Sequence, residues 1–553
     1  MLLSIFLFLT SLQTALEYTL MICLLGAGLW LTFRLGFLQF RRLGHGIAVV
    51  SGRYDKPGAS GDMSHFQALT TALSATVGIG NIAGVALAIH WGGPGAIFWM
   101  WVTAVLGMAT KFSEVTLAQR FRVQLPAEDG QKVGTVAGGP MYYIEKGLGK
   151  KWRPLALFFA FALMLAAFVS GNAIQANTIS DLMRTVFGVP TWLTGCITAA
   201  VVGLVIIGGI SRIGQVTGFL APAMAGIYVL GGLAVIMGNA GEIIPSLRLI
   251  VVEAFEPTAG VAGTGVGVFL QTLLWGVRRG LFSNEAGQGS APIAHSAART
   301  DEPVSEGVVA LLEPFIDTIL ICSITALAIL TTGVWKDTTP TEIWLSSGDI
   351  SFVDASAEWP TARSVVYPLE LEVVQGVIPK ADVQLAWHEV AVDSFFIDEA
   401  HQQVFSGKLH LSGRTGENIA LSADGQEYKR LFGLAVENGA PLTMWAYSAV
   451  LGQFGVYLVL FCVLLFGIST AISWSYYGDR CAIYLFGTRA ILPYRILFVG
   501  MHFLGAVLSL QLVWDLGDLA MSLGTIPNVL ALVLLSGLVR RMSQDYFARM
   551  RKE

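Results

Sequence analysis

The chain has 553 residues, of which 54% are hydrophobic and only 13% are Asp, Glu, Lys or Arg. Ordinary globular proteins carry about 25% charged residues, so this chain has too few charges to cover the surface of a water-soluble fold. That excludes a cytosolic enzyme, a nucleic-acid-binding protein and a disordered scaffold, and the net charge of −4 indicates no polyanionic partner. The composition predicts a protein that resides in a lipid bilayer.

Eleven stretches are apolar over the roughly 20 residues that a spanning helix needs. They lie near residues 12–33, 66–91, 94–118, 154–180, 190–210, 214–238, 264–294, 306–333, 444–477, 493–513 and 515–539. The N-terminal apolar run lacks the basic residues that precede a signal-peptide core and continues into the first stretch, so we do not expect it to be cleaved.

The positions of Lys and Arg predict how the chain is oriented. Basic residues gather in the loops after the first and third spans and in the C-terminal tail. Short cytoplasmic loops carry an excess of Lys and Arg. With eleven spans, all three regions fall on one side, which predicts an outside N-terminus and a cytoplasmic C-terminus.

Residues 334–442 break the membrane pattern. They hold 16 acidic and seven basic residues, and their apolar runs are short, alternate with polar residues and are separated by Gly and Asp turns. Such runs predict a small β-rich domain, and the topology places it outside the cell. A connection this long inside a compact fold calls for an explanation, so we expect an unidentified partner or a lid role for it.

The second span carries glycines and small polar residues at its centre, in the run ATVGIGNIAG from Ala75 to Gly84. A helix break there frees backbone groups that lipid cannot satisfy, so they must face a cavity or a ligand. Carbonyls that end the first half-helix suit a cation, and N–H groups that open the second half suit a carboxylate. Tight helix packing through small residues is the alternative. A dinucleotide fingerprint is excluded because no strand precedes the glycines.

The seventh span contains a second candidate break, in the run from Gln271 to Gly287. Its charged residues Arg278, Arg279 and Glu285 are costly in a membrane unless they face protein or water, although the arginines could also reach the inner surface. The two breaks each open a block of five spans. Interrupted helices at matching positions in two halves of a chain indicate a transporter site.

Two further predicted spans carry polar residues in the part that crosses the membrane interior. Asn172 and Gln175 in the fourth span are three residues apart, so we expect them on one helical face. The ninth span contains Ser469, Thr470 and Ser473. Their hydroxyl oxygens suit Na⁺, but each hydroxyl could instead bond to its own helix.

The remaining chemistry-bearing residues indicate no catalysis. Lys111 and Glu114 in the third span are expected to form a local ion pair near the inner interface. The eight histidines are isolated in the sequence, and the five cysteines are scattered through apolar segments, so neither type predicts a metal site. The chain is therefore not expected to be an enzyme.

Four runs resemble the alanine or glycine:cation symporter family, which contains the sodium:alanine symporters. They are residues 72–84, the run GGPMYYI at 138–144, the run GVRRGLFSNEAG at 276–287 and the run VWDLGDL at 513–519. The resemblance covers essentially the whole chain outside residues 334–442, which depart from the family pattern. It implies an all-α membrane protein with a leucine-transporter-like fold of two inverted five-helix repeats. One extra N-terminal helix makes eleven transmembrane helices, and the β-rich insertion lies on the extracytoplasmic side.

This resemblance implies a division of the chain into six parts. They are an extra N-terminal helix with its basic loop (1–63), a first repeat (64–262), the start of a second repeat (263–333), the outer insertion (334–442), the rest of the second repeat (443–541) and a cytoplasmic tail (542–553). The family also implies a bacterial cell inner membrane.

The second span is similar to the first broken helix of the bacterial leucine transporter, and that likeness implies the binding residues. The amides of Ile79 and Gly80 would hold a substrate carboxylate. Asn81 is similar to a ligand of a further sodium site whose other ligands the sequence does not reveal. The implied substrate residues are Thr76, Gly78, Ile79, Gly80, Asn81, Phe168, Gln175, Gly276, Val277, Thr470 and Trp474. The implied Na⁺ ligands are the carbonyls of Ser74, Val77 and Phe466 and the hydroxyls of Ser469 and Thr470.

The resemblance implies sodium-coupled symport of alanine or glycine into the cell by alternating access, with Na⁺ as the coupling ion and a small zwitterionic amino acid as substrate. Proton coupling is one alternative, but it needs a titratable group at the site, and Glu285 and Glu114 are expected too near the inner face. A transporter-derived sensor that uses the outer domain is another. A channel fits less well, because these groups suit a substrate with both charges rather than a row of ions.

Overall fold

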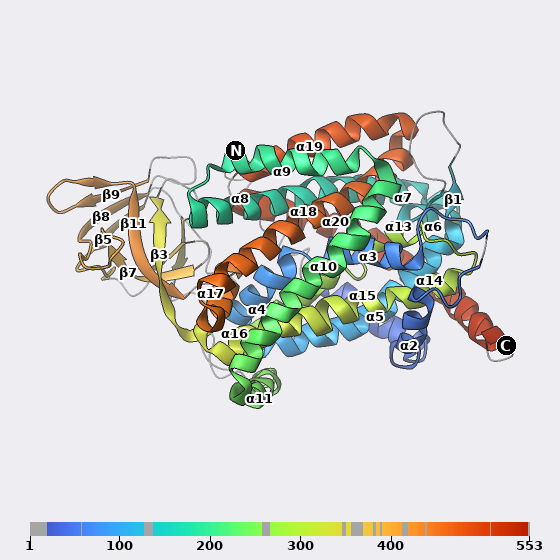
Figure 1. Ribbon diagram of the computed structural model, residues 1–553, viewed down its shortest axis with the longest axis horizontal. Helices are drawn as coiled ribbons and strands as arrows, with labels where there is room; N and C mark the ends of the chain where they lie inside the picture. The colour runs from blue at the N-terminus through green and yellow to red at the C-terminus, as the bar shows by residue number, and fades with distance from the viewer. Residues whose placement is uncertain are drawn as a thin grey trace.

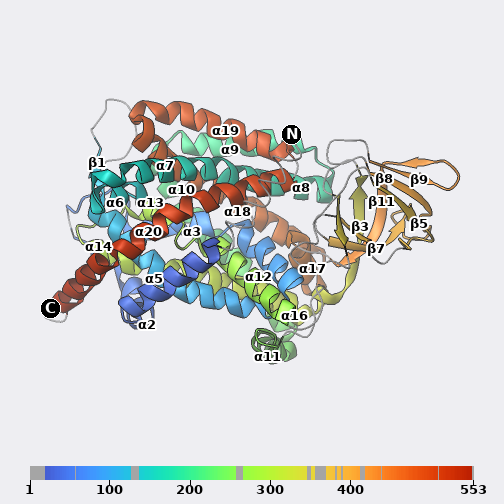
Figure 2. The same cartoon turned by 180° about the vertical axis from the view of Figure 1, so that it is seen from behind.

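The computed structural model describes residues 19–550 apart from 57, 126–135, 257–265, 346–349, 355–368, 380–382, 388–389, 412–417, 437–438 and 509. Its helices form one elongated bundle, with the β-strands at one end and the C-terminus at the other (Figures 1 and 2). Many large apolar side chains on the outside of the bundle are exposed, among them Phe161, Phe219 and Ile496. A contiguous apolar exterior is what a lipid-facing surface requires.

Seven helices in the described part of the chain are long and apolar enough to cross a membrane, or nine if each of two bent pairs counts as one span. The seven are Ala96–Phe121, Lys150–Arg184, Arg212–Gly238, Pro303–Thr332, Gln453–Phe486, Thr488–Val507 and Leu519–Met550. The bent pairs are Thr19–Arg34 with Leu38–Val50, at 81°, and His65–Thr76 with Gly80–Gly92, at 55°. The two other predicted spans are helical but shorter or less apolar, so the count of eleven stays a prediction.

The first half of the bundle contains the following elements: α2 (Leu38–Val50), α3 (His65–Thr76), η1 (Gly80–Gly84), α4 (Val85–Gly92), α5 (Ala96–Phe121), β1 (Val123–Gln124), β2 (Val136–Ala137), α6 (Pro140–Gly147), η2 (Lys150–Trp152), α7 (Arg153–Phe168), η3 (Val169–Ala173), α8 (Ile174–Phe187), α9 (Thr191–Ile206), α10 (Gly209–Gly238), η4 (Ala240–Glu242) and α11 (Ile243–Glu253). The second half contains α12 (Val266–Asn284), α13 (Ala291–His295), α14 (Pro303–Ala310), α15 (Leu312–Pro314), η5 (Phe315–Cys322), α16 (Ser323–Thr332), η6 (Val334–Lys336), α17 (Gly439–Leu451), α18 (Gln453–Phe486), η9 (Thr488–Ala490), α19 (Ile491–Val507) and α20 (Leu510–Met550).

The predicted β-rich segment contains two antiparallel sheets. One has the strand order β10-β9-β8-β5 and the other β3-β11-β7-β6-β4. The strands are β3 (Thr338–Trp344), β4 (Ile350–Asp354), β5 (Leu369–Val373), β6 (Val383–Trp387), β7 (Val390–Phe396), β8 (Gly407–Leu411), β9 (Ile419–Ser422), β10 (Glu427–Tyr428) and β11 (Arg430–Val436). Their inner faces share a separate core that includes Ile343, Val392, Phe395 and Leu409. The segment therefore has a hydrophobic core of its own.

The break in the seventh predicted span lies near the end of the expected run, whereas the ninth predicted span contains an interruption that the sequence analysis did not predict. The seventh stays helical through Gly276 and Gly280 to Asn284, and its break follows at Glu285, which has a φ of 53°. The ninth is divided by Gly452 (φ 59°) into α17 and α18. Gly276 and Gly280 are packing positions, because a Cβ on either would collide with α5.

Of the three short π-helical turns, η3 and η5 lie within long helices and η1 opens the second half of the broken span. Such turns insert an extra residue and are frequent at functional sites. Asn172 lies within η3 and Gln175 lies on α8, and the two side chains contact different partners. Asn172 donates to the carbonyl of Phe498 at 2.8 Å and contacts His502 on α19, whereas Gln175 lines an internal cavity.

Candidate functional site

An internal cavity lies where α3 ends and η1 begins, and residues of η3, α8, α12, α18 and α20 complete its wall. The centre of a water molecule can move over about 20 Å³ inside it. The lining residues are Ala75, Thr76, Gly78, Ile79, Gly80, Ser170, Gln175, Phe282, Glu285, Thr470, Trp474 and Met521. Seven of the eleven predicted substrate residues are among them.

The sequence of the second span explains its break. Ser64 and Gln67 form a reciprocal capping box at the start of α3, and the helix ends at Thr76. The side chain of Asn81 then accepts a 2.9 Å hydrogen bond from the N–H of Gly78. Ile79 and Gly80 open the second half of the span, and the first N–H groups of a helix have no partner within it. Because both residues line the cavity, their amides can meet an anionic group there.

A cluster of neutral oxygens lies beside this break. The hydroxyl of Ser74 contacts the hydroxyl of Ser469 and lies 3.1 Å from its carbonyl oxygen. The hydroxyl of Thr470 donates to the carbonyl of Ser74 at 3.1 Å. All three residues are buried. Hydroxyl and carbonyl oxygens are hard ligands, so the chemistry of this cluster fits a hard cation such as Na⁺. Phe466, four residues before Thr470, is on the same face of α18, and Val77 caps α3.

Two cavity residues have features that fit a bound polar ligand. Gln175 donates to the carbonyl of Ser170 at 3.3 Å, while its buried Oε1 has no partner among the described residues. An unsatisfied buried acceptor is costly, so a donor brought by a ligand would stabilise it. Trp474 packs directly on Gly171, where a Cβ would collide with the indole ring. The glycine of η3 therefore allows Trp474 to reach the cavity.

Four predicted substrate residues lie outside the cavity wall. Phe168 packs on Tyr494 and Phe498 of α19, with ring centroids 5.0 and 6.1 Å apart. Gly276 is against α5, and Val277 is buried in an apolar cluster. Asn81 faces the other way, into a buried polar group on η5.

That polar group is one that the sequence interpretation missed. The side chain of Asn81 donates to Asp317 at 2.6 Å, and the hydroxyls of Ser283 and Thr318 donate to the same carboxylate at 2.5 and 2.8 Å. Asp317 is fully buried. An acidic residue inside an apolar stretch is a functional signal that could have identified Asp317 in the eighth predicted span.

The structure also corrects the predicted depth and pairing of four charged residues. Glu285 lines the cavity rather than the inner face. Lys111 pairs with Glu313 at 2.8 Å rather than with Glu114, whose carboxylate accepts from Asn528 at 2.5 Å. Arg279 is buried beside Gly84 of η1, over the rings of Trp275 and Phe282, and so does not lie at a surface.

Comparison of the chain with known proteins identifies its family. The model of the sodium:alanine symporter family matches residues 4–355 and 418–553. The chain belongs to this family. The protein is therefore a sodium-coupled amino-acid symporter in a membrane, and a transporter rather than an enzyme. The family model leaves residues 356–417 unmatched. This segment is shorter than residues 334–442, which we expected to differ from the family pattern.

Individual relatives match over nearly their whole length. The sodium/alanine symporter AgcS of Methanococcus maripaludis is 37% identical over 94% of this chain and 92% of its own. The probable sodium/glutamine symporter GlnT of Bacillus subtilis is 32% identical over 95% and 87%. Among solved structures, the crystal structure of MhsT in complex with L-phenylalanine aligns with a TM-score of 0.48 at 13% identity, covering 86% of this chain and 90% of that chain.

Proposed function

We propose that this symporter carries alanine or glycine into the cell together with Na⁺, by alternating access around the cavity. The observation that carries the proposal is the small cavity, which lies between the freed amides of Ile79 and Gly80, the unpaired Oε1 of Gln175 and the oxygens around Thr470. The amides suit the substrate carboxylate, and Gln175 suits its ammonium group. A small substrate fits such a cavity better than the glutamine named for one relative.

Sodium binding is coupled to closure because its ligands come from both sides of the site. Ser74 and Val77 belong to the broken helix, whereas Phe466, Ser469 and Thr470 belong to α18. An ion that bridges them stabilises the closed arrangement of the two helices. One Na⁺ crossing about 100 mV releases roughly 2.3 kcal/mol, and a tenfold gradient adds roughly 1.4 kcal/mol. Together these support accumulation of a few hundredfold.

The proposed topology has eleven spans in two inverted repeats of five after an N-terminal helix, with the N-terminus outside and the C-terminus in the cytoplasm of a bacterial cell. The basic loops support this orientation, and it places the β-rich segment on the outer face. Cysteine-accessibility labelling tests it at two exposed positions, Ser51 directly after α2 and Asp424 between β9 and β10. The proposal requires Ser51 to be labelled only from inside and Asp424 only from outside.

The function is tested by uptake of radiolabelled L-alanine into proteoliposomes under an inward Na⁺ gradient. Uptake should fall to the protein-free background when K⁺ replaces Na⁺, and excess glycine should compete more strongly than glutamine. Uptake that is indifferent to Na⁺ would contradict the sodium site. Stronger competition by glutamine would contradict the small substrate.

A further inference from the structure

Two helices from opposite ends of the chain lie together on the outside of the helical bundle. The first described helix, Thr19–Arg34, bends by 81° and continues as α2. This elbow uses two residues in the left-handed conformation, Gly36 (φ 66°) and Phe37 (φ 56°). Near the end of α20, the hydroxyl of Ser536 accepts a 3.3 Å hydrogen bond from Nε1 of Trp30. The elbow therefore lies against the last turns of α20, at the end of the molecule away from the β-strands (Figure 1).

Four arginines surround this elbow, and we call them the arginine cluster: Arg34, Arg41, Arg540 and Arg541. Nη2 of Arg34 lies 3.4 Å from the position that a Cβ on Gly537 would take. Arg540 and Arg541 follow Gly537 by three and four residues, so they lie on the same face of α20. Long side chains on a helix lean over the preceding turn. Nη2 of Arg41 reaches back across the elbow, 3.5 Å from the carbonyl oxygen of Leu35.

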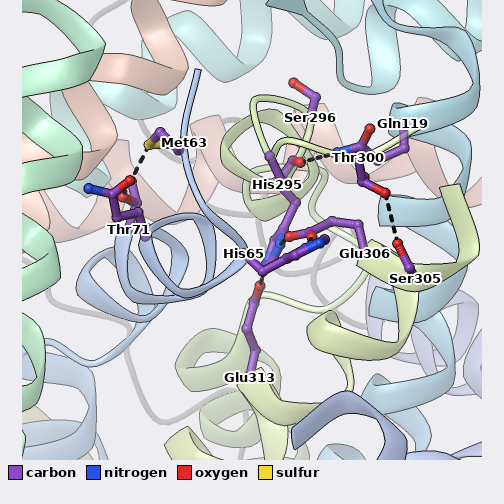
Figure 3. A network of polar contacts seen from close by, with 12 residues as sticks. Met63, His65, Thr71, Gln119, His295, Ser296, Thr300, Ser305, Glu306 and Glu313 are labelled. Atoms are coloured by element: carbon purple, nitrogen blue, oxygen red, sulfur yellow. Dashed lines mark hydrogen bonds and ion pairs between the residues drawn. The ribbon is translucent and has the colours of Figure 1, made fainter. Parts of the chain in front are cut away.

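The charges of the arginine cluster are not balanced by acids. Other charged groups of the helical part contact one another, as His65, Glu306 and His295 do in Figure 3. Among the described residues, ion pairs with a carboxylate form at six other arginines but at no member of the arginine cluster. The buried Nε of Arg34 also has no hydrogen-bond partner there. Like charges repel one another, so an anion bound at the elbow would stabilise the cluster.

The nearest acid on α20 belongs to a different part of the surface. Asp545 follows the two arginines of α20 and lines a pocket together with Arg122 and Arg549. None of the four members of the arginine cluster is among the residues that line that pocket. The missing counter-charge is therefore not supplied by this neighbouring side chain.

The arginine cluster lies where two predicted spans leave the membrane. Arg34 directly follows the first predicted span, and Arg540 directly follows the eleventh. The elbow exposes the large aromatic side chains of Phe33, Phe37 and Phe40. Exposed aromatic rings beside arginines at the end of an apolar span are typical of the boundary between hydrocarbon and lipid headgroups. The cluster is therefore at the depth of the phospholipid phosphates.

We propose that the arginine cluster binds the phosphate of an anionic phospholipid, which connects the N-terminal helix to the end of α20. A guanidinium group donates two parallel hydrogen bonds to a phosphate, and basic sites between spanning helices bind anionic headgroups. The acyl chains of the lipid pack along the exposed rings of the elbow. The proposed topology places this lipid in the inner leaflet, but the site itself depends neither on the substrate nor on the coupling ion.

Lipid binding is measured by native mass spectrometry of the purified full-length protein in detergent. Phosphatidylglycerol and phosphatidylcholine with the same acyl chains are titrated separately, and inorganic phosphate is added in excess in a third series. We expect phosphatidylglycerol to bind at lower concentrations than phosphatidylcholine, which carries no net charge. Excess inorganic phosphate should not displace the bound phosphatidylglycerol, because it lacks the acyl chains that hold the lipid at the elbow.

The decisive variant is Arg34→Gln/Arg541→Gln, and Arg53→Gln/Arg489→Gln is its matched control. The control also removes two positive charges, at exposed positions outside the arginine cluster. The phosphatidylglycerol concentration for half-saturation should rise about tenfold or more in the decisive variant, from lost hydrogen bonds to a charged group. It should change by less than about twofold in the control, because distant exposed charges are screened.

A second variant keeps the test decisive if Arg34, which also lies over the ring of Trp30 at 5.5 Å, is needed for folding. Arg540→Gln/Arg541→Gln changes only exposed side chains and should weaken phosphatidylglycerol binding in the same way.

Three results would overturn the proposal. Equal binding of the two lipids to the wild-type protein would show that the phosphate is not recognised as part of an anionic lipid. Equal effects in the cluster variants and the control would show attraction by net charge alone. Displacement of the lipid by inorganic phosphate would identify the ligand as a free phosphate. Alanine uptake and its Na⁺ dependence are measured separately, so none of these results bears on the proposed transport.

Discussion

Gly78 allows the broken helix and α18 to approach each other, and replacing it with alanine tests that contact. A Cβ at this position would lie 2.8 Å from Oγ1 of Thr470, closer than real side chains pack. Gly78 does not have a positive φ, so the effect is steric and not a matter of backbone conformation. The methyl group must displace Thr470 Oγ1 from its 3.1 Å contact with the carbonyl of Ser74.

Overpacking of this kind costs about 1–3 kcal/mol, which corresponds to a roughly 5- to 150-fold change in an equilibrium constant. We therefore expect the Na⁺ concentration for half-maximal alanine uptake to rise by that factor in Gly78→Ala. The assay is the initial rate of uptake into proteoliposomes as a function of Na⁺. Gly226→Ala on α10 is the control, because a Cβ there meets nothing within 4 Å. An equal Na⁺ dependence in the two variants would refute the reasoning.

Three further substitutions or deletions have defined expected outcomes. Gln175→Leu removes the unpaired Oε1, so the KM for alanine should rise about tenfold or more from a lost hydrogen bond to a charged group, and an unchanged KM would contradict the ammonium assignment. Gly171→Ala should abolish uptake while the protein still folds, because its Cβ collides with Trp474; wild-type uptake would show that Trp474 need not reach the cavity. Deletion of residues 338–440 should alter the uptake kinetics if the outer segment acts as a lid over the site, and unchanged kinetics would remove that role.

Local signals were enough to predict seven of the residues that line the cavity. The run around Gly78 is too rich in small residues for a plain spanning helix, and the family resemblance predicted Thr470 and Gln175 as site residues, both of which line the cavity. Gly276 and Val277 were predicted to contact the substrate but do not line the cavity. The sequence alone does not show at which residue the seventh span stops being helical. The break follows Asn284, so Phe282 and Glu285 reach the cavity instead.

The buried cluster of His65, Glu306, His295, Glu313 and Lys111 could not be predicted from local patterns. Its contacts join residues that are distant in the chain, such as His65 and Glu306, which are separated by 241 positions. Lys111, Glu306 and Glu313 are charged residues in apolar segments, a pattern that signals a role but not which partners they contact, and the histidines are isolated in the sequence. The divergence of Asn172 and Gln175 was equally hidden, because a π-helical turn changes which face a residue occupies. The helical register and the packing of distant segments determine which of these side chains contact one another.

The most direct test of a sodium site at Thr470 is the Na⁺ dependence of alanine uptake in Thr470→Ala. Thr331→Ala is the matched control, because within the described part of the chain the Thr331 hydroxyl donates only to the carbonyl of Leu327 on its own helix. Removal of a ligand oxygen should weaken the free energy of Na⁺ binding by about 1.5–3 kcal/mol. The half-saturating Na⁺ concentration should therefore rise roughly 10- to 150-fold in Thr470→Ala. It should stay near the wild-type value in Thr331→Ala. An unchanged Na⁺ dependence in Thr470→Ala would contradict the sodium site and the coupling built on it.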